Sequence, residues 1–105
     1  MSRSYWGYVL TNVPRTVMYV GMTNNLERRV AEHLSGEIKG FTQRYHLHTL
    51  VHAEMFDRVD DAIAREKQIK GWSRAKKNAL VEQHNPTWAD LAEGHYGKDP
   101  SLRSG

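Results

Sequence analysis

Two short runs of aromatic and β-branched residues, separated by only a few polar positions, constrain the fold of this chain most. The runs are SYWGYVL at residues 4–10 and TVMYVG at residues 16–21, and both have the composition of β-strands. The connection NVPR at residues 12–15 contains Asn and Pro, and a loop of this length commonly joins antiparallel neighbours. We therefore expect a β-hairpin in which Tyr8 faces Tyr19 on the same side of the sheet.

A helix is expected after the hairpin. Its apolar residues recur at a spacing of four, which is typical of an amphipathic helix: Leu26, Val30 and Leu34. Thr23 or Asn24 is expected to cap its start, and Gly36 to end it. The stretch at residues 37–46 has no clear period and indicates a loop.

A third strand and two further helices complete the expected order. The alternation in LHTLVHAEMF predicts a strand over residues 47–56. Capping signals then predict the remaining boundaries: a helix from Asp60 or Asp61 to Gly71, a helix capped by Ser73 and running through Glu82, and a return segment in which Trp88 and Leu91 pack on the body. This order predicts an α+β fold with a small three-stranded antiparallel sheet flanked by helices. The sequence does not predict the order of the strands within the sheet.

Length and composition favour one domain in a reducing compartment. A chain of 105 residues supports a single modest core. We expect this domain at residues 1–92, and a polar tail at residues 93–105. The sequence contains no cysteine, no apolar run long enough to span a membrane and no apolar signal segment at its start. These absences predict a cytoplasmic protein with no membrane partner.

Glu66 interrupts an otherwise apolar helical face. On a helical wheel it falls near the centre of a stripe formed by Val59, Ala62, Ile63 and Ile69. Its carboxylate should therefore point inward, while its basic neighbours point elsewhere. A buried carboxylate is costly unless a cation, several hydrogen-bond donors or a metal ion pairs with it.

The basic residues are concentrated in one segment. Lys and Arg exceed Asp and Glu by only 15 to 12, a net charge of +3. Between residues 65 and 77, however, six basic residues accompany the single acid Glu66: Arg65, Lys67, Lys70, Arg74, Lys76 and Lys77. Such a segment provides a positive field suited to phosphates, although a solvated helix face is the commoner explanation.

Several residues on separate elements have the chemistry that phosphodiester hydrolysis needs. Arg29 and His33 lie one helical turn apart and share a face. Arginine binds phosphate oxygens with two donors, and tyrosine or histidine can position and deprotonate water. One carboxylate with water suffices to hold Mg²⁺. Considered alone, Tyr8 and Tyr19 are better explained as an ordinary cross-strand aromatic pair.

The spacing of these residues resembles that of the GIY-YIG nuclease family, in particular its small single-domain bacterial members. The first motif appears as Trp6-Gly7-Tyr8, which departs from the family pattern before the tyrosine, and the second as Tyr19-Val20-Gly21. The stretches TNNLERRVAEH, GFTQRY, AREKQIKGW and NPTWADL are also similar, so the resemblance covers about residues 5–91. Some members carry a lysine directly after the second motif, where this chain has Met22.

The resemblance implies a compact DNA endonuclease that uses one Mg²⁺ or Mn²⁺ ion. Glu66 would be the metal ligand and Arg29 would hold the scissile phosphate. Tyr8, Tyr19 and His33 would arrange or deprotonate the water, with the general base left open.

The expected DNA contacts come from the basic segment and one asparagine. They are Arg65, Lys67, Lys70, Arg74, Lys77 and Asn85. Asn85 is assigned as the family asparagine because it lies in the turn before Pro86, with Asn78 as the competing candidate.

Three functions follow from these expectations. The first is a structure-directed or weakly specific endonuclease in DNA repair, recombination or processing, with RNA also open as a substrate and with a protein partner or a homodimer supplying specificity. The second is a non-catalytic nucleic-acid-binding module with the same fold. The third is an interaction domain without a nucleic-acid partner. If Glu66 instead forms an ion pair with Arg29, no metal is needed.

Overall fold

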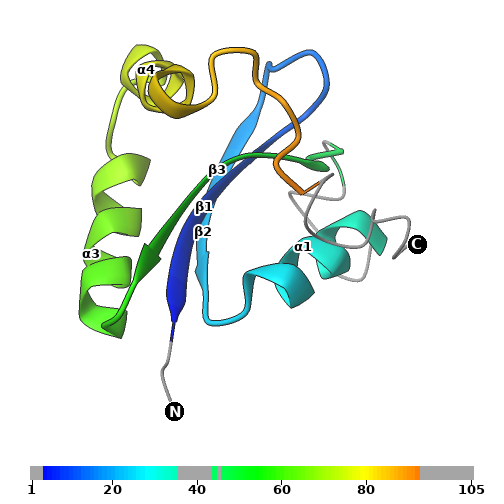
Figure 1. Cartoon of the computed structure of the whole chain (residues 1–105). Coiled ribbons are helices and arrows are strands. Elements are labelled where there is room, and N and C mark those ends of the chain that lie inside the picture. The colour runs from blue at the N-terminus through cyan, green and yellow to red at the C-terminus, as the bar shows by residue number, and fades with distance from the viewer. Residues whose placement is uncertain (1–3, 36–43, 45, 93–105) are drawn as a thin grey trace.

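The sheet is antiparallel throughout, and its strands are arranged in the order β2-β1-β3. A computed structural model describes residues 4–35, 44 and 46–92 of the chain (Figure 1). The described elements are β1 (Tyr5–Thr11), β2 (Met18–Thr23), α1 (Leu26–Ser35), β3 (Thr49–Phe56), α3 (Val59–Lys70) and α4 (Arg74–His84). The expected α+β class and the three-stranded antiparallel sheet are confirmed.

The connection between β1 and β2 is longer than the sequence indicated. It spans residues 12–17 instead of 12–15. The side chain of Asn12 organises it, because its Oδ1 accepts hydrogen bonds from the backbone N–H groups of Thr16 at 2.9 Å and Val17 at 3.1 Å. Its Nδ2 also donates to Thr16 Oγ1 at 2.8 Å. Residues 16 and 17 are therefore held in the loop and do not start the strand.

This longer loop shifts the register of the hairpin. Tyr8 pairs with Gly21, and Tyr19 pairs with Leu10. The prediction that Tyr8 faces Tyr19 directly is therefore wrong. The two tyrosines still point to the same side of the sheet and lie on a diagonal.

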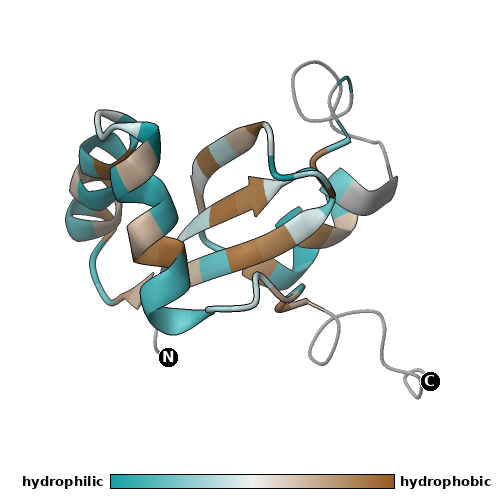
Figure 2. Cartoon of the chain, turned by 90° about the horizontal axis from the view of Figure 1, so that it is seen from above, coloured by the Kyte–Doolittle hydropathy of each residue, from teal (hydrophilic) through white to brown (hydrophobic). Residues whose placement is uncertain are grey.

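Helices cover both faces of the sheet. Figure 1 shows α1 on one side, with α3 and α4 on the other. The core under α1 contains Tyr8, Leu10, Leu26, Val30, Leu47, Leu50 and Ala92. The core under α3 and α4 contains Val9, Val20, Val51, Ile69, Leu80, Val81 and Trp88. Successive residues of β1 thus serve opposite cores, as a strand buried on both faces requires, and Figure 2 shows apolar residues concentrated along the strands.

The helix ends differ slightly from the expected ones. Asn25 caps α1, because its Oδ1 accepts from the N–H of Arg28 at 3.0 Å, so the predicted caps Thr23 and Asn24 are wrong by one or two positions. Helix α3 starts at Val59, just before the predicted aspartates, and its C-cap is Gly71 as expected. Ser73 caps α4 as predicted.

The segment after α4 returns to the sheet. Trp88 is buried in one core and Leu91 packs against the other, as the sequence indicated. The backbone N–H of Leu91 donates to the carbonyl oxygen of Leu50 at 2.7 Å, which ties this segment to β3. The expected end of the first helix at Gly36, most of the loop at 37–46 and the tail at 93–105 lie outside the described residues.

Candidate active site

Two tyrosines meet above Gly21, on the edge strand β2. A Cβ built on Gly21 would lie 2.6 Å from Tyr8 Oη, 2.7 Å from Tyr8 Cζ and 2.8 Å from Tyr19 Cε2. Both rings therefore use the space that the missing side chain leaves, and their centroids are 6.2 Å apart. Because β2 is an edge strand, the Tyr8 hydroxyl is placed at the border of the sheet. A substrate approaching this border can meet side chains from helices on both faces.

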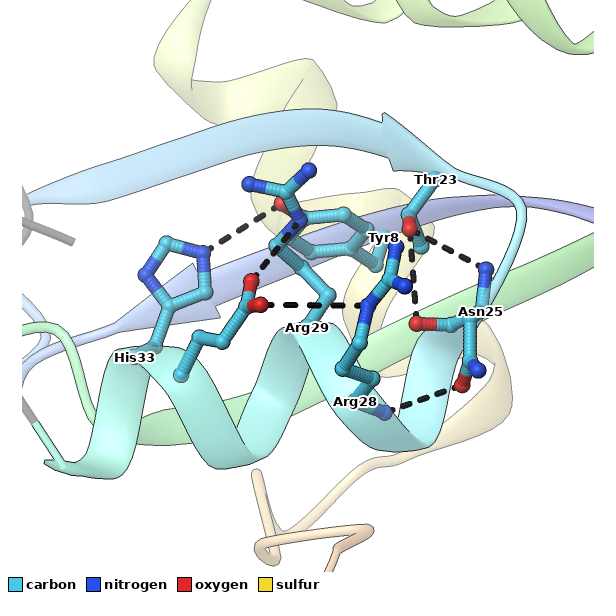
Figure 3. Close-up of polar contacts among 7 residues, drawn as sticks. Tyr8, Thr23, Asn25, Arg28, Arg29 and His33 are labelled. Carbon is cyan, nitrogen blue, oxygen red and sulfur yellow. Dashed lines mark hydrogen bonds and ion pairs between the residues drawn. The ribbon is translucent and has the colours of Figure 1, made fainter. Parts of the chain in front are cut away.

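His33 reaches this point from α1. Its Nε2 lies 3.3 Å from the Tyr8 hydroxyl, within hydrogen-bonding distance, and its ring centroid is 5.8 Å from that of Tyr19 (Figure 3). Burial lowers the pKa of His33, and the positive charge of Arg29 lowers it further. Burial and then the neighbouring Tyr19 phenol raise the pKa of Tyr8 well above that of an ordinary phenol. At neutral pH, Tyr8 is therefore a protonated phenol and His33 a neutral imidazole.

Arg29 places a guanidinium group beside the two phenols. It opposes the rise in the Tyr8 pKa, which shows that its charge acts on that hydroxyl. Its Nε lies 3.8 Å from Glu32 Oε1, an ion-pair distance that is too long for a hydrogen bond (Figure 3). This Nε is buried and finds no hydrogen-bond partner among the described residues. A buried N–H group without a partner is costly, and an anion at this position would satisfy it.

Glu66 acts on the Tyr8 phenol electrostatically from α3, which packs on the other side of the sheet. Its negative charge contributes to the raised Tyr8 pKa, and its side chain is only 20% exposed. The expected apolar stripe is buried at Ala62 and Ile69 but 37% exposed at Val59 and at Ile63. The buried face of α3 is therefore narrower than the helical wheel predicts, and Glu66 lies near the edge of that face.

The partner of Glu66 was not foreseen. Lys70 Nζ lies 2.9 Å from Glu66 Oε2, one helical turn further along α3. The expectation that all its basic neighbours point elsewhere is therefore wrong. Arg29, the partner considered in the alternative without metal, forms its ion pair with Glu32.

The single carboxylate at this site is compatible with a hard divalent cation. Within residues 4–35, 44 and 46–92, no group of three or more His, Asp, Glu or Cys side chains could hold a metal ion. Zinc sites need three or four such ligands, whereas Mg²⁺ binds through one or two carboxylates and keeps several waters. Glu66 provides one half-buried carboxylate, which is the kind of ligand that Mg²⁺ uses.

Two of the residues expected to contact DNA make specific contacts within the protein. The Arg65 guanidinium binds Glu54 through Nε at 2.9 Å and Nη2 at 3.1 Å, and it lies over the Trp72 ring. Arg74 donates to the carbonyl oxygens of Arg15 and Thr16 in the loop between β1 and β2. Both charges remain near the surface, but their donors are largely used.

The two asparagine candidates also have structural contacts. Asn85 is buried, and its amide donates to the carbonyl oxygens of Val51 at 3.1 Å and Ala89 at 2.9 Å while accepting from the N–H of Ala89. These bonds hold the segment after α4, so they do not support a direct contact of Asn85 with DNA. Asn78 accepts a hydrogen bond from Arg74 Nε at 3.0 Å. Of the other expected contacts, Lys67 is exposed and Lys77 half-buried.

A polar network that the sequence did not indicate lies on β3, away from the tyrosines. Glu54 lies between Arg65 and His52, whose Nε2 is 2.7 Å from Glu54 Oε2. Burial opposes ionisation of Glu54, but its hydrogen bonds to Arg65 and His52 hold its pKa below the ordinary value. Glu54 and His52 share the alternating strand pattern, and only the fold shows that Arg65 meets them.

The chain is similar to several known proteins. The model of the GIY-YIG catalytic domain matches residues 4–78. A UPF0213 protein of Natronomonas pharaonis is 46% identical over 81 residues, which is 77% of this chain and 94% of that protein. A UPF0213 protein of Syntrophus aciditrophicus is 40% identical over 85 residues, covering 80% of this chain and 95% of that one. The solution NMR structure of a UPF0213 protein of Bacillus halodurans superimposes with a TM-score of 0.55 at 25% identity, covering 89% of this chain and 98% of that chain.

Among the described residues, no helix has the length and apolar character that crossing a membrane requires. With two phenols, an imidazole, a guanidinium and a carboxylate converging at the edge of a three-stranded sheet, and with the family match over residues 4–78, the chain belongs to the GIY-YIG nuclease family.

Proposed function

We propose that this protein is a divalent-metal-dependent endonuclease that hydrolyses phosphodiester bonds in DNA. The observation that carries the proposal is the buried Nε of Arg29, which lacks a hydrogen-bond partner among the described residues although its guanidinium lies beside Tyr8. A phosphate oxygen supplies the anionic acceptor that this group requires. Arg29 would then hold the scissile phosphate against the two phenols.

The proton of the attacking water is proposed to leave through Tyr8 and His33. Tyr8 stays protonated because its pKa is raised, so it can donate to His33 while accepting a hydrogen bond from water. His33 stays neutral because its pKa is lowered, so it can receive the proton. Tyr19 would orient the same water from the other side of Gly21. In this assignment His33 is the general base and the tyrosines are positioning groups.

Glu66 would hold the metal ion, Mg²⁺ or Mn²⁺. When bound, such a cation supplies positive charge that offsets the negative charge developing on the phosphate in the transition state. In this proposal the phosphate would lie between the Glu66 carboxylate on α3 and the Arg29 guanidinium on α1, both of which act on the Tyr8 phenol. The guanidinium of Arg29 is also paired with Glu32 at 3.8 Å, so a bound phosphate would compete with that carboxylate for Arg29.

The substrate is proposed to be recognised through its backbone and its structure. The expected contacts in the basic segment are lysines and arginines, which bind phosphates regardless of sequence. We therefore place the protein in DNA repair, recombination or processing, with residues 1–92 as the nuclease domain. The absence of cysteine fits action in the reducing cytoplasm.

A cleavage assay tests this function. Purified protein is incubated with plasmid and with branched, nicked and single-stranded oligonucleotides of DNA and RNA, in Mg²⁺, in Mn²⁺ and in chelator. We expect metal-dependent cleavage that Glu66→Gln and Arg29→Met both reduce by at least about a hundredfold. Retained cleavage in Glu66→Gln would contradict the metal assignment. Arg28→Met is the matched control, because Arg28 is the neighbouring arginine on α1 and its side chain is 58% exposed.

The second candidate is a module that binds nucleic acid without cutting it. The ion pair between Glu66 and Lys70 favours it, since the carboxylate already has a cationic partner. This candidate predicts salt-sensitive binding and no product in either metal. The same assay, combined with a binding measurement on each substrate, separates the two functions.

A further inference from the structure

The ion pair between Lys70 and Glu66 differs from the other pair of the same spacing in the described residues. In that other pair, Arg28 Nε lies 3.8 Å from Glu32, and the side chains are 58% and 30% exposed. Lys70 Nζ lies 2.9 Å from Glu66, whose side chain is only 20% exposed. The Lys70–Glu66 pair is therefore the closer of the two, and its carboxylate is less exposed to solvent. It is also the one that borders the two tyrosines.

Burial explains why Glu66 needs this partner. A carboxylate that is largely removed from water loses its stabilising hydration. A cation or hydrogen-bond donors must compensate for this loss. The ammonium group of Lys70 supplies this compensation from the next turn of α3. In this state the ion pair restrains the position of the carboxylate on α3.

A divalent cation needs the same carboxylate. The Lys70 ammonium group contacts one oxygen of the Glu66 carboxylate. Its charge lowers the affinity of the second carboxylate oxygen for a metal cation, because two positive charges at this distance repel each other. Lys70 can move away from Glu66, since its side chain is 52% exposed and its ammonium group is carried on a flexible four-carbon chain. Binding of metal therefore has to displace or overcome Lys70.

We propose that Lys70 is a positioning residue that holds Glu66 in the metal-free site and sets the metal concentration at which the site fills. This inference rests on the proposed function, because it takes Glu66 as the metal ligand. It changes the role of Lys70 from a contact with DNA to a competitor of the metal ion. It also explains how a half-buried acid remains ordered before the metal and the substrate arrive.

Metal binding without DNA tests the inference directly. Free Mn²⁺ is followed by electron paramagnetic resonance while it is titrated into the full-length protein, the Lys70→Met variant and the Glu66→Gln variant. Methionine keeps most of the side-chain volume and removes the charge. We expect Lys70→Met to bind Mn²⁺ at least about threefold more tightly than the unmodified protein, given the usual strength of partly exposed ion pairs.

Two further variants separate competition from a general effect of charge. Lys76→Met makes the same substitution on α4, where Lys76 lies over the Trp72 ring, and should leave Mn²⁺ affinity unchanged. Lys70→Arg keeps the charge and should bind Mn²⁺ no more tightly than the unmodified protein. Lys70→Gln serves as a second neutral variant if Lys70→Met does not fold, and the same tightening is expected of it.

The outcomes distinguish the inference from the function on which it rests. If Glu66→Gln abolishes Mn²⁺ binding but the neutral Lys70 variants bind no more tightly, the inference is wrong and the proposed metal site stands. Mn²⁺ binding that Glu66→Gln leaves intact overturns both. Equal tightening in Lys76→Met would assign the effect to net charge and would also overturn the inference.

Discussion

At the level of single residues, Gly21 decides how closely the two tyrosines approach. Its missing side chain leaves the space that Tyr8 Oη and Tyr19 Cε2 occupy, at 2.6 Å and 2.8 Å from an ideal Cβ. We expect Gly21→Ala to push both rings away and to lower the free energy of unfolding by about 1–3 kcal/mol, the usual cost of overpacking. Urea unfolding measures this loss.

Gly7 offers the matched control for this substitution. It is also a buried strand glycine, but a Cβ there would meet only Phe56 Cε2, at an ordinary contact distance of 3.9 Å. Gly7→Ala should therefore change the free energy of unfolding by less than about 1 kcal/mol. Equal effects of the two substitutions would show that the space above Gly21 is not specifically required.

The titration of His33 gives a prediction about stability and pH. Its pKa in the folded protein lies below the ordinary value of 6.5. The unfolded chain therefore takes up a proton at a higher pH than the folded protein does. The stability contributed by the neutral, buried imidazole is fully present above about pH 6.5 and is lost as pH falls through the lower folded pKa.

Urea unfolding from about pH 8 to about pH 5 checks this dependence. We expect stability to fall at the acidic end in the unmodified protein and to fall less steeply in His33→Gln, which cannot titrate there. Parallel curves for the two proteins would assign the acid sensitivity to other groups.

The residue types of the candidate site could be predicted from the sequence, but their pairings could not. The family pattern identifies Tyr8, Tyr19, Arg29, His33 and Glu66, since it depends on spacing along the chain. A helical wheel that follows apolar residues does not predict the contact between Lys70 and Glu66. The contact between Arg65 and Glu54 joins residues eleven positions apart on two elements, and no local pattern encodes it.

At the level of elements, the loop between β1 and β2 shows where local rules fail. The strand composition correctly predicted a hairpin, but the register depends on the side chain of Asn12, which holds two further residues in the loop. Composition alone treats Thr16 and Val17 as strand residues because both are β-branched. Helix ends were predicted more closely, since Ser73 and Gly71 act through local hydrogen bonds.

Arg74 anchors this loop to α4, and its role can be separated from DNA binding. Its guanidinium donates to the carbonyl oxygens of Arg15 and Thr16, a geometry that needs two donors in one plane. Arg74→Lys keeps the charge but not this geometry. We expect it to lower the free energy of unfolding by about 1 kcal/mol while leaving DNA affinity nearly unchanged.

Arg74→Met completes the comparison, because it removes both the charge and the hydrogen bonds. Urea unfolding and DNA binding at two salt concentrations are measured for both variants. If Arg74→Lys is as stable as the unmodified protein and Arg74→Met alone loses DNA affinity, then Arg74 acts chiefly through phosphate contacts, as the sequence had suggested.

At the level of the whole molecule, the strand order shows how one small sheet can present residues from both of its faces. With β1 in the centre and β2 at the edge, α1 and α3 lie on opposite faces (Figure 1). The proposed site would take Arg29 and His33 from the helix on one face and Glu66 from the helix on the other.

The described part of the chain contains one such constellation, so one copy should cut one strand. On supercoiled plasmid we expect open circles to accumulate first, and linear molecules to appear only later or at higher protein concentration, when a second copy cuts the opposite strand. Gel electrophoresis over time at several ratios of protein to plasmid measures this order, with Glu66→Gln as the inactive control. Linear product formed directly at the lowest ratio would instead require two sites acting together, and hence a dimer on the DNA.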